Sequence, residues 1–350
     1  MRESARRVVS RAVVCGGVSA LHRRLRWKDG SMILYGHRVT GDDEGYLAGL
    51  SPAHLEGQIT YLKKHYRFIS LSELVACLRE QRPVPRMSVV LTFDDGFRDN
   101  YLHAFPILKR HGVPATVFLT TGSVTLGRLP WSQRLGFVLQ TTGAPLVPAR
   151  FLTPAGMELG NPRERRLAYL ALKTALRPLP VEAREDYIDG LAEALGVVPP
   201  GDRMVTWDQV REMQAAGIDF GAHTVTHAFL AELPPEDALR EIEQSMIEVR
   251  QQTGVEAPVF AFPGGSWNDG LIEMVKRAGA SGVCKPGQGF RVNSLATVTP
   301  FSLARTGILN GPAYLMEAEL DGPFPWIRAF CRRCAAARRR HRREPQAAQR

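Results

Sequence analysis

The sequence predicts an α/β fold in which helices surround a parallel sheet that is closed, or nearly closed, into a barrel. Short runs of apolar and β-branched residues alternate with amphipathic helical stretches along most of the 350-residue chain. Polar motifs follow directly after several of the expected strands, where such barrels place their active sites. With 44% hydrophobic residues the chain can bury the core of one large domain.

The first part of the chain alternates regularly between the two element types. We expect strands at 32–39, 68–70, 89–93 and 115–119. The helices expected between them cover 52–65, 71–79 and 100–111. Ser51 and Pro52 give the first helix a cap and a first-turn proline, and Gly112 ends the third.

The same alternation returns after residue 202. We expect helices at 207–216, 235–253 and 270–278, with strands at 218–220, 259–262 and 303–308. Residues 125–202 interrupt this rhythm with two helical stretches, 163–177 and 181–195, between loops rich in Pro and Gly. They predict a mainly helical insertion. Trp131 near its start either packs in the core, as most tryptophans do, or faces a sugar.

Two adjacent carboxylates, Asp94 and Asp95, follow the apolar strand at 89–93 and precede Gly96. Neighbouring carboxylates repel each other, so a bare pair would be destabilising. A bound cation removes that cost and leaves one carboxylate free to act as a base. This segment therefore predicts acidic chemistry at the end of a buried strand.

Two histidines, His223 and His227, follow the expected strand at 218–220. On a helical turn, residues four apart share one face and can hold one metal ion. Such a pair alone is more often coincidental. Together with one carboxylate it makes a three-ligand site that leaves room for water, as catalytic metals require.

At these residues the sequence resembles the NodB-homology polysaccharide deacetylases, carbohydrate esterase family 4. The resemblance covers about residues 31–309 and includes 92–96, 223–227 and 260–265. Residues 32–39 resemble the entry strand of the poly-N-acetylglucosamine deacetylase branch. The resemblance implies a distorted (β/α)7 TIM-like barrel. It also implies a hydrolase that removes N-acetyl or O-acetyl groups from an amino-sugar polysaccharide or glycan precursor.

The residue types then suggest roles in that reaction. Asp95, His223 and His227 would hold a divalent metal, for which we favour Zn2+, with Co2+, Ni2+ or Fe2+ as alternatives. Asp94 would be the general base. A backbone N–H near Pro263 and Gly264 would stabilise the oxyanion.

The proton donor is less clearly marked. Many family members use a histidine late in the chain, but here no histidine lies between His227 and His341. His37 matches the entry-strand histidine of the poly-N-acetylglucosamine branch, so we expect it to be the acid; the alternative is a packed histidine. Gly264 stands where many relatives carry tyrosine, which leaves the substrate preference open.

Three further polar residues have alternative interpretations. Arg305 on the strand at 303–308 would orient Asp94, bind a sugar carboxylate or form a simple ion pair. Asp99 and Asp208 are possible supporting groups of the site. Asp208 is more simply an acid in the first turn of a helix.

The net charge of +10 is concentrated at the two ends of the chain. We expect a basic N-terminal segment at 1–30, a catalytic domain at 31–310 and a basic tail at 311–350. Such ends favour an anionic membrane surface or an acidic polysaccharide. We expect no nucleic acid partner, because no interleaved aromatics accompany the arginines.

The same features bear on location. The chain contains no apolar run near 18 residues and only five cysteines. We therefore expect a cytoplasmic protein, peripheral to the inner membrane, with export by a weak N-terminal signal as the alternative.

Two other function classes remain open at this point. Two histidines and one carboxylate also occur in non-haem iron oxygenases, although those do not call for an Asp–Asp pair. The chain could also be a non-catalytic carbohydrate-binding descendant of the fold, but metal binding alone would not need Asp94.

Overall fold

The computed structural model describes residues 3–26, 30–41, 49–151, 156–286, 292–322 and 324 of the chain. Within this described part, seven parallel strands form a barrel. In order around the barrel they are β1 (Ser31–Gly36), β10 (Leu303–Gly307), β9 (Val283–Pro286), β8 (Phe260–Ala261), β7 (Ile218–Ala222), β4 (Ala115–Leu119) and β3 (Ser88–Phe93). The pairing of β1 with β3 closes the ring. The short strand β2 (Arg67–Phe68) pairs with the start of β3. The predicted α/β barrel is confirmed.

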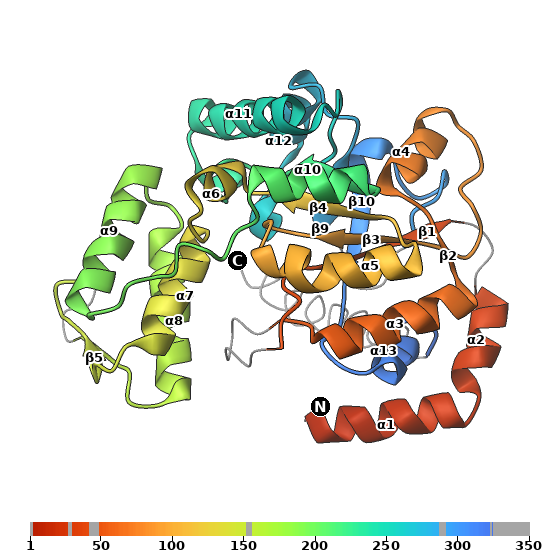
Figure 1. Ribbon diagram of the computed structural model, residues 1–350, viewed down its shortest axis with the longest axis horizontal. Coiled ribbons are helices and arrows are strands. Elements are labelled where there is room, and N and C mark those ends of the chain that lie inside the picture. The colour runs from red at the N-terminus through yellow and green to blue at the C-terminus, as the bar shows by residue number, and fades with distance from the viewer. Residues whose placement is uncertain are drawn as a thin grey trace, which may run out of the picture.

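Helices surround the barrel on its outer side (Figure 1). They are α3 (Pro52–His65), α4 (Leu71–Arg79), α5 (Phe105–His111), α10 (Trp207–Ala215), α11 (Pro235–Thr253) and α12 (Asp269–Arg277). Ser51 caps α3 by accepting a hydrogen bond from the His54 N–H, as the sequence predicts. Gly112 ends α5 in the left-handed conformation.

The alternation of side chains along β3 sets the direction of Asp94, which follows the strand. Alternate residues of β3 pack outward with residues of α3, α5 and α10; these are Val89, Leu91 and Phe93. Val90 belongs instead to the cluster that contains Ile33 of β1 and Phe118 of β4. Successive strand residues point to opposite faces, so Asp94 continues the inward row beyond Val90 and Thr92.

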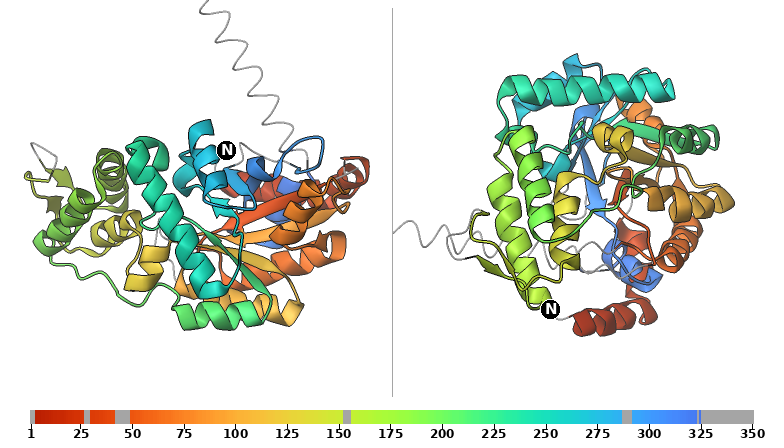
Figure 2. Two further views of the ribbon diagram at one scale, coloured as in Figure 1. Left: turned by 90° about the horizontal axis from the view of Figure 1, so that it is seen from above. Right: turned by 60° about the vertical axis from the view of Figure 1, so that its left-hand side comes forward.

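The insertion between β4 and β7 folds around a hydrophobic cluster of its own. It contains α6 (Thr121–Leu126), α7 (Trp131–Thr141), α8 (Pro162–Leu176), α9 (Val181–Ala194) and a hairpin of β5 (Leu146–Val147) and β6 (Met157–Glu158). The helices α7, α8 and α9 stand together to one side of the barrel (Figures 1 and 2). Two of the three were predicted; α7 was not.

Two predicted elements have different bounds. The strand predicted at 32–39 ends at Gly36, because the following backbone turns to side chains of the next segment: the Val39 N–H donates to Asp99 and the His37 carbonyl accepts from Asn100. The helix predicted at 100–111 begins as a π-helical turn, η2 (Asn100–Ala104). Pro106 follows at once and has no N–H to continue the regular ladder.

The strands predicted at 68–70 and 259–262 are also shorter, as the bounds of β2 and β8 show. Each of these strands pairs with its neighbours over two residues only, Arg67 and Phe68 in β2 and Phe260 and Ala261 in β8. Short apolar runs give no signal for such narrow pairing.

The N-terminal segment forms α1 (Glu3–Cys15) and α2 (Val18–Arg26). The helix α13 (Ala313–Leu320) packs against α1 and α3 and buries Met316 and Leu320 in the main core. Arg23 reaches Asp321 at 2.9 Å. The packed chain therefore extends past the boundary predicted at residue 310.

No helix in the described ranges has the length and apolar character needed to cross a lipid bilayer. The arginine-rich part of the predicted tail, 325–350, lies outside the described residues. Contact of the chain ends with an anionic membrane, and the cytoplasmic location, stay predictions.

Candidate metal centre and catalytic pocket

Asp94 lies at the end of β3 and is held by an arginine from β10, which only β1 separates from β3 in the barrel. Arg305 of β10 donates two hydrogen bonds to its carboxylate, at 2.6 and 2.8 Å, and both side chains are buried. Burial alone would raise the pKa of Asp94, but the Arg305 charge outweighs it and the pKa is lowered. Asp94 is therefore an ionised carboxylate with a fixed orientation. Its pairing with Arg305 agrees with the first role predicted for Arg305, which is to orient Asp94.

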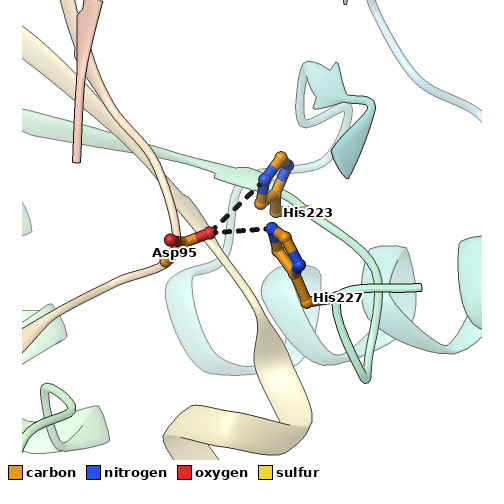
Figure 3. Close-up of side chains that lie close together, drawn as sticks. All are labelled: Asp95, His223 and His227. Atoms are coloured by element: carbon orange, nitrogen blue, oxygen red, sulfur yellow. Dashed lines mark ion pairs between the residues drawn. The ribbon is translucent and has the colours of Figure 1, made fainter. Parts of the chain in front are cut away.

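Asp95 faces the two predicted histidines (Figure 3). Its Oδ1 atom lies 3.2 Å from His227 Nε2 and 3.5 Å from His223 Nε2. One ligand atom from each residue lies within 4.8 Å of the others, and all three residues are buried. The fold thus brings residues that are more than 120 positions apart in the sequence to within the distances of a metal site.

The donor chemistry of these three side chains fits a divalent metal. His223 Nδ1 lies 2.7 Å from the Ala261 carbonyl oxygen, so this nitrogen carries the proton and Nε2 keeps its lone pair. Burial lowers the pKa of His223 to about 4, which keeps the ring neutral. Asp95 Oδ1 is buried without a hydrogen-bond donor. A carboxylate oxygen that faces a lone pair calls for a cation between them.

The segment that carries both histidines is an irregular loop rather than the helical turn that we predicted. Thr224 and His227 adopt positive φ angles of 67° and 57°, and Asp95 adopts 75°. Such conformations are strained for residues other than glycine and persist where the surroundings enforce them. The prediction of a shared helical face was wrong, yet the two imidazoles still meet.

Two residues hold this loop in place through contacts that the sequence did not reveal. The Glu241 carboxylate of α11 accepts hydrogen bonds from the Val225 N–H at 2.8 Å and the Thr226 N–H at 2.9 Å. Trp131 of α7 is buried and donates from Nε1 to the His227 carbonyl at 3.2 Å. The core alternative for Trp131 is therefore correct, and its indole connects the insertion to a candidate metal ligand.

His37 follows β1 and lines a cavity of about 380 Å³ together with Phe93, the residue before Asp94. Its side chain is exposed, and its charge would lower the pKa of both Asp94 and Asp95. Asn100 donates to the His37 carbonyl at 2.8 Å. The histidine thus stands at the mouth of the site on a braced backbone and is not a packed core residue.

The third motif forms a tight turn, η4 (Pro263–Gly265), directly after β8. Proline has no N–H, and the Gly265 N–H already bonds to the Phe262 carbonyl. Gly264 is left as the donor for an oxyanion. It has a φ of 56°, and a Cβ there would lie 2.1 Å from Phe229. The Phe229 ring thus takes up the space beside Gly264.

The two remaining carboxylates have structural surroundings. Asp99 pairs with Arg38 at 2.8 Å and accepts from the Val39 N–H, so it braces the segment after His37. Asp208 lies in the first turn of α10 and pairs with Arg211 at 2.5 Å. Neither belongs to the group of candidate metal ligands.

Comparison with known proteins agrees with this geometry. The sequence profile of the polysaccharide deacetylase family matches residues 81–161 and 174–283. A poly-beta-1,6-N-acetyl-D-glucosamine N-deacetylase of Staphylococcus aureus is 38% identical over 76 residues, which are 21% of this chain and 26% of that protein. The match therefore spans about a quarter of the length of this curated relative.

Solved structures show the same fold. A Streptococcus pyogenes deacetylase, PplD in complex with acetate, aligns with a TM-score of 0.55 and 20% identity over 84% of this chain and 98% of that one. IcaB from Ammonifex degensii also aligns with a TM-score of 0.55 and 20% identity, over 83% and 96% of the two chains. At this identity the likeness concerns the fold alone.

Proposed function

Since the chain belongs to the polysaccharide deacetylase family, whose profile covers more than half of it, we propose that it is a metal-dependent hydrolase of acetylated glycans. It removes N-acetyl or O-acetyl groups from an amino-sugar polysaccharide or glycan precursor. The observation that carries this proposal is that the adjacent carboxylates Asp94 and Asp95 have different partners. Asp95 joins two histidines, while Asp94 is ionised and held by Arg305.

Asp95, His223 and His227 would hold the metal. We propose Zn2+, with Co2+, Ni2+ and Fe2+ as the alternatives that this set of nitrogen and oxygen ligands also accepts. When bound, such an ion polarises an acetyl carbonyl and makes a water molecule more acidic. Three protein ligands leave coordination positions free for that chemistry.

Asp94 accepts the proton of the attacking water. Arg305 keeps this carboxylate ionised and donates a hydrogen bond to each of its oxygens. The carboxylate is therefore held in one orientation for the proton transfer. The Gly264 N–H stabilises the negative charge that develops on the carbonyl oxygen, as backbone donors do in acyl transfer. We assign these roles to residues that the fold brings to one end of the barrel.

His37 donates the proton that the leaving amine requires. An imidazole is suited to this step because its ordinary pKa lies near neutrality. Support comes from its exposed position in a cavity that Phe93, the neighbour of Asp94, also lines. Glycan with its acetamido group at the metal centre would place the leaving nitrogen on this open side.

The proposal is tested by acetate release. Purified protein, stripped with a chelator and then reloaded with zinc, cobalt, nickel or iron, is incubated with a panel of N-acetylated oligosaccharides and an activated acetyl ester. We expect no release from the stripped protein and recovery on reloading. Release that survives complete metal removal would exclude the metal-dependent mechanism.

The two alternatives give different results in the same assay. A non-catalytic carbohydrate-binding protein would bind oligosaccharide and release no acetate. An iron oxygenase would need Fe2+ and consume oxygen, whereas hydrolysis proceeds without oxygen.

A further inference from the structure

One face of α8 in the insertion ends against the loop that carries His227. Tyr169, Lys173 and Arg177 follow one another at intervals of four residues, so they lie on one side of the helix. The Lys173 ammonium lies 5.4 Å from the centre of the Tyr169 ring. Burial raises the pKa of Tyr169 and lowers that of Lys173, and the charge of Asp95 raises both.

The last residue of this row is fixed by contacts of its own. The Arg177 guanidinium lies 4.2 Å from the centre of the Phe229 ring and pairs with Glu232. The Phe229 ring in turn lies 6.3 Å from the His227 ring. These contacts attach the end of α8 to the metal-site loop, and they occupy the charge of Arg177.

Lys173 has no such partner. Within the described ranges no carboxylate pairs with it, and its side chain is only partly exposed. Burial, and then the neighbouring Arg177, lower the pKa of Lys173, while the charge of Asp95 opposes them. A metal bound to Asp95 would cancel that last effect. A half-buried ammonium without a counter-ion is unfavourable unless a ligand supplies the anion.

The cavity that His37 lines offers space for a ligand. Its described lining includes His37, Gln133 and Arg38, whose charge is paired with Asp99, and contains no carboxylate. Its volume of about 380 Å³ lies within the range of small-ligand sites. The described lining of this cavity thus places no carboxylate against a bound ligand.

We propose, on the basis of the deacetylase function above, that the preferred glycan carries an anionic group close to its acetamido group, and that Lys173 of α8 binds this group. The anion is a carboxylate or a phosphate, since an ammonium recognises both as a point charge. The Tyr169 ring holds the lysine side chain in place. Substrate preference would then reside in the insertion and not in the barrel.

The test compares three glycans on the zinc-loaded full-length protein. They are a neutral N-acetylglucosamine oligomer, an oligomer alternating N-acetylglucosamine with glucuronic acid, and N-acetylglucosamine 1-phosphate. Acetate release gives kcat and KM, and calorimetric titration gives Kd. The variants are Lys173→Met, Lys173→Arg and, as matched control for the lost charge, Lys64→Met on the exposed face of α3.

We expect the wild-type protein to prefer one acidic glycan. Lys173→Met should raise KM and Kd for that glycan on the order of 10-fold, since a charged hydrogen bond is lost, and leave kcat and the neutral oligomer little changed. Lys173→Arg should keep most of the affinity, and Lys64→Met all of it. Whichever acidic glycan shows the effect identifies the anion.

Two results would overturn the inference. The first is that the wild-type protein binds the neutral oligomer as tightly as both acidic glycans. In that case the inference fails but the deacetylase function still stands. Equal losses on neutral and acidic glycans in Lys173→Met would assign the lysine to the chemistry instead. If no glycan releases acetate, the proposed function fails, while the titrations still decide whether Lys173 binds an anion.

Discussion

At the scale of single residues, Asp94 and Asp95 are neighbours with different surroundings. One accepts two hydrogen bonds from Arg305, and the other faces His223 and His227. The Asp–Asp–Gly segment was enough to predict acidic chemistry at this strand end. The partner of Asp94 could not be fixed in advance, because Arg305 lies 211 residues away and could equally have formed an unrelated ion pair.

Replacement of Arg305 should change the pH dependence of the reaction. Arg305 lowers the pKa of the buried Asp94, so Arg305→Met should raise it, because the largest effect that opposes burial is then lost. The base works only when ionised, so the acidic limb of the kcat/KM profile should move to higher pH. Arg305→Lys keeps a charge and should move it less.

Metal content and circular dichroism measured across the same pH range serve as controls, because an unpaired buried carboxylate also destabilises the fold. An acidic limb at the same pH in Arg305→Met and wild type, with metal retained, would show that Asp94 is not the titrating base.

His37→Ala tests the proton donor. The variant should bind metal normally, and kcat on an N-acetyl substrate should fall on the order of 10²-fold. An activated O-acetyl ester has a leaving group that needs little protonation, so its hydrolysis should suffer far less. Equal losses on both substrates, with a lower melting temperature, would instead indicate a structural role for His37.

At the scale of elements, the metal-site loop shows where sequence patterns stop being informative. The spacing of His223 and His227 predicted a pair of ligands but also a helical turn, and the turn is wrong. The observed loop depends on Glu241 of α11 and Trp131 of α7. These contacts come from distant elements, and neither residue stands in a recognisable motif.

The helices and strands were predictable to different degrees. Helices with clear caps, such as α3 after Ser51, begin where the sequence indicates. The strand predicted to reach Val39 stops at Gly36, because Asp99 and Asn100 hold the next backbone groups. Apolar patterns carry no information about such side-chain competition for backbone hydrogen bonds.

At the scale of the whole molecule, the barrel explains why separate motifs form one site. The carboxyl ends of parallel strands meet at one end of the barrel, so residues after β1, β3, β7 and β8 come together. That much follows from the alternation of elements. The position of α8 does not, because it depends on how the insertion packs against Phe229 and the His227 loop.

The central claim is that Asp95 binds the metal and Asp94 transfers the proton. Zinc content and acetate release, measured on the same preparations of wild type, Asp94→Asn and Asp95→Asn, test it most directly. The account predicts about one zinc per chain in the wild type and in Asp94→Asn, because three ligands remain. Turnover of Asp94→Asn should fall by about 10² or more. Asp95→Asn should lose zinc and activity together. Zinc retained in Asp95→Asn but lost in Asp94→Asn would contradict the account.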